Sequence, residues 1–309
     1  MKLGFVSAIA GEYSYEGLMD LAAALGYACV EVACWPAGKA ERRYAGVSHI
    51  DVEKVLEDDA YASHIKAYAA GAGDGKGVEI SSLAYYPNTL DPDPAKRAAH
   101  VEHLKNVIRA SAKLGVGMAT TFIGRDQGKT VEANLELVKE VWPAIIAVAE
   151  ENGVKVAIEN CPMLFGIDQW PGGQNLMTSP ANWKKVFEIL PGKNLGINYD
   201  PSHFVWQMID YIKPIYEFAD RIYHVHIKDL KVYKDKLDQV GIMAYPLDFM
   251  APKLPGLGDV DWGAYVGALN DIGYDGHICI EVEDRSYEGS DEKIRQSLVL
   301  SKRYMEQFV

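Results

Sequence analysis

The feature that most constrains this chain is a regular alternation of short apolar runs with longer amphipathic stretches. The short runs predict strands, because they are rich in β-branched and apolar residues. They lie at 3–9, 29–34, 79–85, 118–123, 154–160, 195–200, 222–229 and 278–284. The helical patterns lie near 15–25, 51–70, 94–114, 130–152, 179–190, 205–219, 261–272 and 290–307. Eight such units in 309 residues predict an α/β fold, a (β/α)8 TIM barrel that forms a single domain over 1–309.

An open, doubly wound sheet is the competing topology for the same alternation. Such a sheet normally places a glycine-rich phosphate loop after its first strand. The corresponding stretch here, "SAIAGEYS", contains no GxGxxG pattern. Several helix starts carry capping residues, namely Ser14, Asp51, Thr130, Ser179 and Asp261. The closed barrel is therefore the favoured interpretation.

Charge and hydropathy exclude several classes of partner. The formal net charge of −12 repels a phosphate backbone, so we expect no nucleic-acid partner. No run approaches the roughly 20 apolar residues of a membrane span, and the apolar run at the N-terminus is soon interrupted by Glu12. We therefore expect a cytoplasmic protein that does not associate with membranes and acts on a small polar molecule. Assembly into a homo-oligomer is compatible with the sequence.

Polar residues stand at the carboxyl ends of four consecutive predicted strands. In a barrel these ends form the mouth, where such residues are typically catalytic. The residues are Glu159-Asn160, Asp200 with the following Ser202-His203, His224 and His226 with Lys228, and Glu281 with Glu283. Three carboxylates and one imidazole form a donor set for a divalent cation. We expect Mn²⁺ to be the bound ion, with Mg²⁺, Co²⁺ or Zn²⁺ as alternatives.

Each of these residues also has a structural explanation when taken alone. A single carboxylate at a strand end is more often a helix cap or a salt-bridge partner, and a single histidine can be a hydrogen-bonded core residue. Periodicity does not choose between His224 and His226 as the donor. His100 and His103 lie three residues apart on a predicted helix, where we expect a solvated face. The metal hypothesis therefore depends on all four strand ends together.

The chain resembles the xylose-isomerase-like TIM barrels from the first predicted strand to the last. The resemblance is strongest over "VAIENCPM", "NYDPSHFVWQMIDYI", "HVHIKD", "PGLGDVDW" and "ICIEVED". This family includes sugar and sugar-phosphate isomerases, ketose 3-epimerases, inosose dehydratases and apurinic-site endonucleases. The resemblance implies that Glu159, Asp200, His226 and Glu281 are the metal ligands and that His203 contacts substrate oxygens. Ketose 3-epimerases carry a further glutamate where this chain has Phe165, which argues against epimerisation of a free ketohexose.

These residues predict a metal-dependent isomerase or epimerase of a sugar or sugar phosphate. A divalent ion would stabilise the enediolate that forms when the C–H next to a carbonyl loses its proton. Glu159 and Glu281 would remove and return that proton as the catalytic residues. Lys228 and Arg285 are candidates for binding substrate hydroxyls or a phosphate, with charge balance of the acidic cluster as the alternative. Trp35, in the extended loop 35–50, could stack on a sugar or pack against its own loop.

The same proton abstraction can end in elimination, which gives a lyase or dehydratase on an inosose or a 3-oxo-glycoside. The long segment after residue 228, rich in aromatic residues and proline, suits a lid over such a larger substrate. An apurinic endonuclease is less favoured, because the second and third predicted strands lack the extra histidines that its three-metal site requires. A non-catalytic sugar sensor is unattractive, because all four ligand positions are retained.

Overall fold

The computed structural model describes residues 1–36, 45–164 and 170–309. Its strands are β1 (Lys2–Val6), β2 (Cys29–Ala33), β3 (Glu79–Ala84), β4 (Met118–Thr121), β5 (Lys155–Glu159), β6 (Leu195–Tyr199), β7 (Ile222–Ile227), β8 (Asp229–Val232), β9 (Met250–Lys253) and β10 (His277–Ile280). Its α-helices are α1 (Tyr15–Ala24), α2 (Val52–Glu57), α3 (Asp59–Gly75), α4 (Pro94–Leu114), α5 (Val131–Glu151), α6 (Pro180–Ile189), α7 (Ser202–Trp206), α8 (Lys213–Glu217), α9 (Lys234–Val240), α10 (Trp262–Asp271) and α11 (Asp291–Met305). Short 3₁₀ helices are η1 (Ser7–Ala10), η3 (Pro246–Asp248) and η4 (Arg285–Tyr287).

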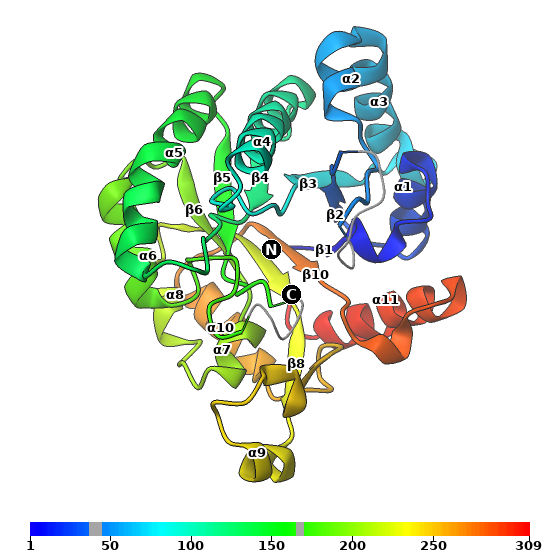
Figure 1. Cartoon of the computed structure of the whole chain (residues 1–309). Coiled ribbons are helices and arrows are strands. Elements are labelled where there is room, and N and C mark those ends of the chain that lie inside the picture. The colour runs from blue at the N-terminus through cyan, green and yellow to red at the C-terminus, as the bar shows by residue number, and fades with distance from the viewer. Residues whose placement is uncertain (37–44, 165–169) are drawn as a thin grey trace.

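The strands β1 to β7 and β10 close into a parallel barrel in the order β1-β10-β7-β6-β5-β4-β3-β2. Helices surround this barrel (Figure 1), which confirms the predicted (β/α)8 architecture. Close packing of β6 against β7 requires a glycine, because a Cβ atom at Gly196 would lie 2.3 Å from the Tyr223 ring. Closure of the sheet brings the carboxyl ends of all eight strands to one mouth.

The predicted helix starts are confirmed by their capping bonds. The side chains of Ser14, Asp51, Thr130, Ser179 and Asp261 each accept a hydrogen bond from a backbone N–H in the first turn that follows. These bonds satisfy donors that a helix leaves without an internal partner. The sequence signals therefore place the helices on the outside of the barrel correctly.

Two predicted helices are each divided in two. The stretch 51–70 forms α2 and α3, because Asp58 takes an extended conformation and its carboxylate accepts hydrogen bonds that start α3. The stretch 205–219 forms α7 and α8, because the Asp210 side chain accepts the backbone N–H groups of Ile212 and Lys213. In both cases a local aspartate competes with helix continuation.

The core lies between the barrel and its helices, and large aromatic residues fill it. Trp142, Trp183 and Trp262 are fully buried or nearly so. Each indole N–H has a partner: Ile123 O at 3.0 Å, Met177 O at 2.8 Å and the Asp229 carboxylate at 3.0 Å, respectively. Burial of these side chains therefore leaves no indole donor unsatisfied.

The prediction of a solvated face for His100 and His103 is wrong. His103 is only 8% exposed, and its ring nitrogens lie 2.8 Å from Cys34 O and 2.9 Å from Glu53 Oε1. His100 is half-buried and lies 2.9 Å from the Asn88 carbonyl. These contacts arise because α4 packs against α2 and the end of β2, a tertiary arrangement that the helix sequence does not specify.

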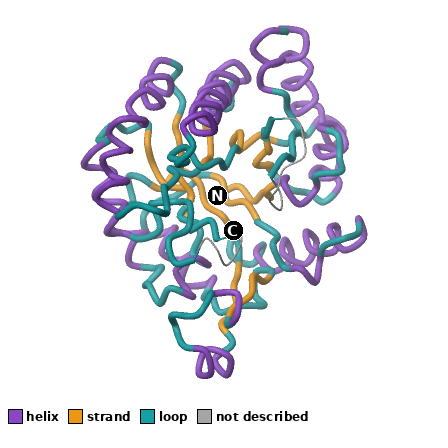
Figure 2. Tube along the Cα trace, viewed as in Figure 1, coloured by secondary structure: helices purple, strands orange, loops and turns teal. Residues whose placement is uncertain are grey.

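The long segment after β7 is not a simple loop. It forms an antiparallel hairpin, β8 with β9, in which α9 and η3 lie between the two strands. Figures 1 and 2 show this hairpin extending away from the barrel. No helix in the described parts of the chain has both the length and the apolar character that crossing a bilayer requires.

Candidate metal centre and active site

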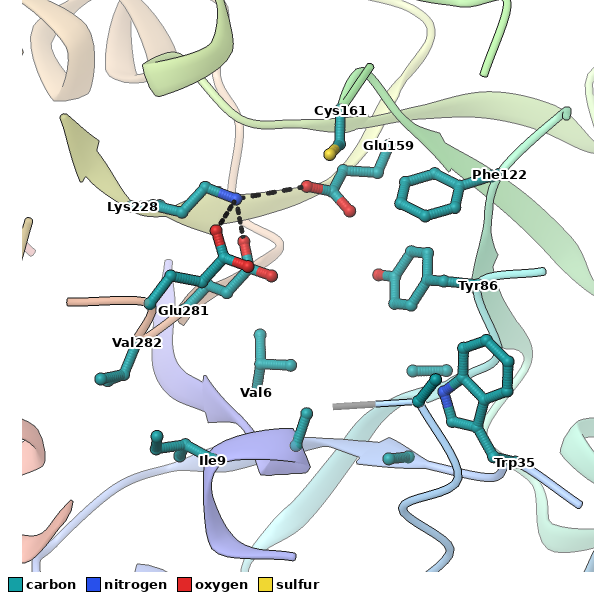
Figure 3. Close-up of a pocket in the computed structure, with 15 residues that line it drawn as sticks. Val6, Ile9, Trp35, Tyr86, Phe122, Glu159, Cys161, Lys228, Glu281 and Val282 are labelled. Carbon is teal, nitrogen blue, oxygen red and sulfur yellow. Dashed lines mark hydrogen bonds and ion pairs between the residues drawn. The ribbon is translucent and has the colours of Figure 1, made fainter. Parts of the chain in front are cut away.

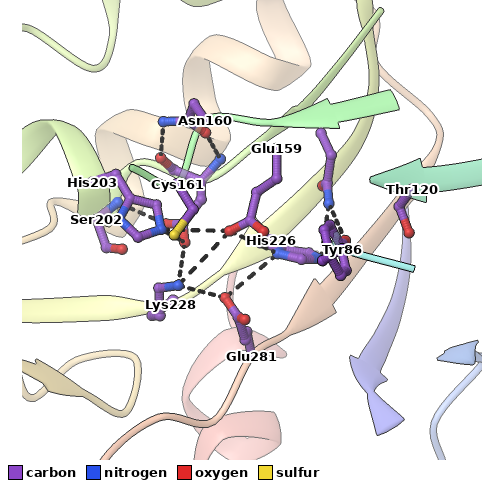
Figure 4. A network of polar contacts seen from close by, with 12 residues as sticks. Tyr86, Thr120, Glu159, Asn160, Cys161, Ser202, His203, His226, Lys228 and Glu281 are labelled. Carbon is purple, nitrogen blue, oxygen red and sulfur yellow. Dashed lines mark hydrogen bonds and ion pairs between the residues drawn. The ribbon is translucent and has the colours of Figure 1, made fainter. Parts of the chain in front are cut away.

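The four predicted metal ligands meet at the mouth of the barrel, and Figure 4 shows three of them, Glu159, His226 and Glu281, turned toward one another. One donor atom from each of Glu159, Asp200, His226 and Glu281 lies within 4.8 Å of the others. Glu159 ends β5, His226 lies on β7, and Asp200 and Glu281 directly follow β6 and β10. Closure of the barrel brings β5, β6, β7 and β10 side by side, so four separate stretches of sequence converge at one point.

Several of these donor atoms have no hydrogen-bond partner among the described residues. Glu159 Oε1, Asp200 Oδ2 and His226 Nδ1 are all buried, and their partners are ionisable groups of the same cluster, such as Lys228 Nζ, 3.0 Å from Asp200 Oδ2. Buried carboxylates that converge in this way need cationic charge between them, which Lys228 supplies in part and a metal ion can complete. Three carboxylates and one imidazole nitrogen match the donor preferences of a divalent cation. The site therefore fits a divalent metal ion.

The Lys228 ammonium group lies among the same carboxylates (Figures 3 and 4). Its Nζ atom is 2.6 Å from Glu281 Oε2, 3.0 Å from Asp200 Oδ2 and 3.3 Å from Glu283 Oε2. Burial alone would lower the pKa of Lys228, but the surrounding carboxylates raise it well above its usual value. Lys228 therefore carries a positive charge that balances part of the acidic cluster.

Electrostatics keep the two proposed catalytic glutamates ionised. Burial alone would raise the pKa of Glu159, but the neighbouring His226, His203 and Lys228 lower it below its usual value. Burial likewise opposes ionisation of Glu281, and Lys228 outweighs it, so the pKa of Glu281 is also lowered. Both groups are thus carboxylates at neutral pH, as a metal ligand or a general base requires.

His203 lies next to the ligand cluster, on α7. Its Nε2 atom is 3.3 Å from Asp200 Oδ2 and 3.4 Å from Glu159 Oε1, and it makes no hydrogen bond within the described part of the chain. The backbone beneath it is fixed, because Asn160 Nδ2 donates to the Asp200 carbonyl and Asn160 Oδ1 accepts from the Asp200 N–H, each at 2.8 Å. This position leaves His203 able to contact a substrate oxygen.

Sequence reasoning missed Glu31, which lies on β2 across the barrel interior. It is fully buried, and its Oε2 atom is 3.1 Å from His226 Nε2. The Tyr86 hydroxyl donates to Glu31 Oε1 at 2.6 Å, and the Ser82 hydroxyl lies 3.2 Å from Oε2. Burial would raise the pKa of Glu31, but His226 lowers it. The available signal was a single acidic residue inside the apolar run "CVEVAC", where a buried charge requires a partner.

His224 lies one step deeper in the barrel than His226. It is fully buried, with Nδ1 3.0 Å from Asn198 Oδ1 and Nε2 3.1 Å from Ser81 Oγ. Asn198 Nδ2 is in turn 2.9 Å from His226 Nε2. His224 therefore belongs to a polar network beneath the ligand cluster, while His226 faces the carboxylates.

Two cavities adjoin this cluster. The first cavity opens to solvent, is mainly apolar, and has Trp35, Tyr86 and Phe122 in its wall (Figure 3). Arg285, the other predicted substrate-binding residue, does not line it and instead lies exposed at the second cavity. Phe165 and positions 37–44 of the loop 35–50 lie outside the described residues.

The fold and the site together define a (β/α)8 barrel with a candidate metal centre at the carboxyl ends of its strands. The chain belongs to the xylose isomerase-like TIM barrel family, whose model matches residues 19–304. An inosose dehydratase from Clostridium perfringens is 22% identical, over 67% of this chain and 70% of its own length.

Solved structures share the fold. A D-psicose 3-epimerase from Clostridium cellulolyticum H10 aligns with a TM-score of 0.70 at 18% identity, over 100% of this chain and 99% of its own. The IOLI protein, whose structure holds a bound zinc atom, aligns with a TM-score of 0.69 at 18% identity, over 100% of this chain and 99% of its own. These similarities show that the chain shares its whole fold with these two proteins.

Proposed function

We propose that the protein is a divalent-metal-dependent isomerase or epimerase of a sugar or sugar phosphate. The observation that carries the proposal is the convergence of Glu159, Asp200, His226 and Glu281, whose donor atoms lie within 4.8 Å of one another, beside a cavity. Similarity to an inosose dehydratase and to a ketose epimerase supports chemistry next to a sugar carbonyl. We propose Mn²⁺ as the ion, because oxygen donors dominate the set.

The mechanism uses two carboxylates that both line the first cavity, Glu159 and Glu281. Glu159, Asp200, His226 and Glu281 would hold a divalent ion, which would supply positive charge to stabilise the negative charge that develops beside the carbonyl. Glu159 takes the proton from the neighbouring carbon and later releases it to solvent, and for epimerisation Glu281 takes up a proton from solvent and passes it to the opposite face. For isomerisation, one of the two carboxylates moves the proton between neighbouring carbons. His203 and Lys228 hold the substrate oxygens in place through hydrogen bonds.

Elimination is a second candidate outcome of the same proton abstraction. It is supported by the similarity to inosose dehydratases, and it requires only a leaving group on the carbon next to the one that loses its proton. The residues that hold the substrate and remove the proton would be unchanged. Isomerase and dehydratase activities are therefore distinguished by their products.

The decisive experiment incubates metal-loaded protein in D₂O with ketoses, aldoses, sugar phosphates and inososes. We expect deuterium to enter one substrate at a carbon next to the carbonyl, with the product identified by NMR.

Glu159→Gln and Glu281→Gln should each lower turnover by at least about 100-fold, because the amide loses the basicity of the carboxylate. Glu79→Gln, at the exposed start of β3, is the matched control and should retain activity. Near-normal turnover in either active-site variant would remove that residue from the mechanism.

A further inference from the structure

A second group of metal-binding side chains lies beside the four-ligand centre. One donor atom from each of Glu159, Cys161 and His203 lies within 4.8 Å of the other two. Figure 4 shows the Cys161 side chain turned toward His203 and Glu159. Glu159 belongs to both groups, so its carboxylate would lie between two ions. The four-ligand centre is complete without the thiol, so Cys161 adds a donor of a different chemical kind.

The backbone that carries Cys161 is held in place. Asn175 Nδ2 donates to the carbonyl oxygens of Glu159 and Cys161, at 2.8 and 2.7 Å respectively. The Cys161 sulfur accepts the backbone N–H of Met163 at 3.4 Å. A hydrogen bond to sulfur favours the thiolate, which is the form that binds metal. Two of the three donors are therefore fixed relative to each other before any ion arrives.

His203 gives an independent indication that this point receives a ligand. The residue is only 8% exposed, and its Nε2 atom is buried and makes no hydrogen bond within the described ranges. That atom lies 3.3 Å from Asp200 Oδ2 and 3.4 Å from Glu159 Oε1. Both distances exceed the usual hydrogen-bond range of about 2.7–3.2 Å. A buried ring nitrogen in this position is better satisfied by a bound ion or ligand than by its present neighbours.

The barrel mouth also carries enough negative charge for a second cation. Lys228 is the ammonium group that lies among its carboxylates. One divalent ion together with Lys228 leaves part of the negative charge unbalanced. The carboxylates are Glu31, Glu159, Asp200, Glu281 and Glu283.

We propose that Glu159, Cys161 and His203 form a second metal position, which binds zinc in preference to Mn²⁺. A thiolate and an imidazole nitrogen are donors that zinc favours, whereas Mn²⁺ favours oxygen donors. Donors at about 2.0–2.3 Å from one tetrahedral zinc ion lie up to about 3.8 Å apart. Donor atoms at the 4.8 Å limit would therefore need to approach by about 1 Å.

The second metal position is accessible from both cavities. Glu159 and Cys161 line the first cavity, and Cys161 and His203 line the second, whose wall includes β9 of the inserted hairpin. Three protein donors leave the fourth tetrahedral place for water. Formation of the zinc–sulfur bond releases the thiol proton to solvent, as does any proton that the His203 nitrogen carries. With Mn²⁺ alone, His203 stays available for substrate.

The test is the metal stoichiometry of the full chain. Protein freed of metal by a chelator, and kept reduced by a phosphine, is titrated with ZnCl₂ or with MnCl₂, and bound metal is measured by elemental analysis. We expect two zinc ions per chain and one Mn²⁺. Co²⁺ used in place of zinc should give a near-ultraviolet thiolate-to-cobalt charge-transfer band. One zinc ion per chain, without such a band, would overturn the proposal.

Matched cysteine variants locate the thiolate. Cys161→Ala should bind one zinc ion, show no charge-transfer band and still bind one Mn²⁺. Cys34→Ala is the control and should keep two zinc ions and the band, because Cys34 is fully buried just after β2 with its sulfur 3.3 Å from Val32 O. His203→Asn should weaken binding of the second zinc ion by about tenfold or more. Circular dichroism checks that each variant is folded, and a band that survives Cys161→Ala would overturn the proposal.

This inference and the proposed function fail in different ways. A single zinc ion in both the native protein and Cys161→Ala removes the second metal position and keeps the four-ligand centre. Two zinc ions with a band that depends on Cys161, but no deuterium uptake from any carbonyl substrate under Mn²⁺, keep the second metal position and remove the proposed function.

Discussion

His226 presents its two ring nitrogens to different groups. Nδ1 lies 3.5 Å from both Glu159 Oε1 and Glu281 Oε2, and Nε2 lies 3.1 Å from Glu31 Oε2. A metal-binding histidine commonly donates its second ring N–H to a carboxylate, which fixes the ring orientation and the tautomer. At the scale of single residues, the site is therefore a set of four candidate ligands with a layer of buried polar residues beneath it.

Replacement of individual histidines should separate their roles. His226→Asn should lower metal affinity by about tenfold or more, because an imidazole donor is lost. His203→Asn should bind Mn²⁺ nearly normally while kcat/KM falls, because we propose that this residue contacts substrate and not the Mn²⁺ ion. His224→Asn should mainly lower stability, since His224 is fully buried in the polar network. Metal titration with thermal unfolding checks all three, and equal metal affinity in the three variants would contradict the ligand assignment.

Glu31 should act as a positioning residue for His226. We expect Glu31→Gln to weaken Mn²⁺ binding by roughly 10–100-fold, because the amide is a weaker acceptor for the His226 N–H. Calorimetric metal titration measures this, and a Co²⁺ absorption spectrum reports any change in ligand geometry. Glu79→Gln on the neighbouring strand β3 is the control, since Glu79 pairs with Lys2 and His277 away from the site. Unchanged affinity and spectrum in Glu31→Gln would show that Glu31 has only a packing role.

At the scale of elements, Asp229 fixes the β8–β9 hairpin to the barrel. This fully buried carboxylate accepts hydrogen bonds from the backbone N–H groups of Leu230, Gly256 and Val260 and from the Trp262 indole. A buried carboxylate is stable here because four donors replace its hydration. The position of the hairpin, and with it the wall of the second cavity, therefore depends on one side chain.

Asp229→Asn should destabilise the protein by about 3 kcal/mol, because the amide NH₂ would face backbone and indole donors and leave them unsatisfied. Urea unfolding measures the change, and hydrogen exchange should show faster exchange at 229–232 and 250–253. Asp238→Asn on the exposed helix α9 is the control, and we expect a change below about 0.5 kcal/mol. Unaltered exchange in the hairpin would contradict the anchoring role.

At the scale of the whole molecule, the closed barrel concentrates negative charge at one mouth. Glu31, Glu159, Asp200, Glu281 and Glu283 are balanced by Lys228 and by nearby imidazoles, while unsatisfied donor atoms remain. A divalent ion at this point would bind the folded chain and not the unfolded one, because the donors come from four strands. Metal binding should therefore be coupled to global stability.

Mn²⁺ at about one hundred times its dissociation constant should stabilise the fold by about 2.7 kcal/mol. The expected result is a rise in Tm of several degrees that a chelator reverses. The Glu281→Gln variant is the internal control, and its Tm should respond less at the same Mn²⁺ concentration. A Tm that does not respond to Mn²⁺, Mg²⁺, Co²⁺ or Zn²⁺ would contradict the metal centre.

The sequence by itself determined the features that depend on local pattern. Alternating strand and helix periods specify eight βα units, and capping residues such as Thr130 and Asp261 specify where helices begin. Because parallel strands of a barrel share one carboxyl end, Glu159 and Asp200 could be placed at the same mouth without coordinates. The proximity of Glu159 to Asp200 could be predicted from chain order alone, since β5 and β6 are adjacent in both sequence and space.

Only the tertiary structure decided the features that depend on contacts across the barrel or between inserted segments. Glu31 and His226 are 195 positions apart and meet through the barrel interior, and no local period encodes such a pair. The burial of His103 and the second cavity likewise depend on how α4 and the β8–β9 hairpin pack. The physical reason is that strand and helix periods are set by residues that are neighbours in sequence. Side-chain burial and hydrogen-bond partners are set by the surfaces that closure of the barrel brings together.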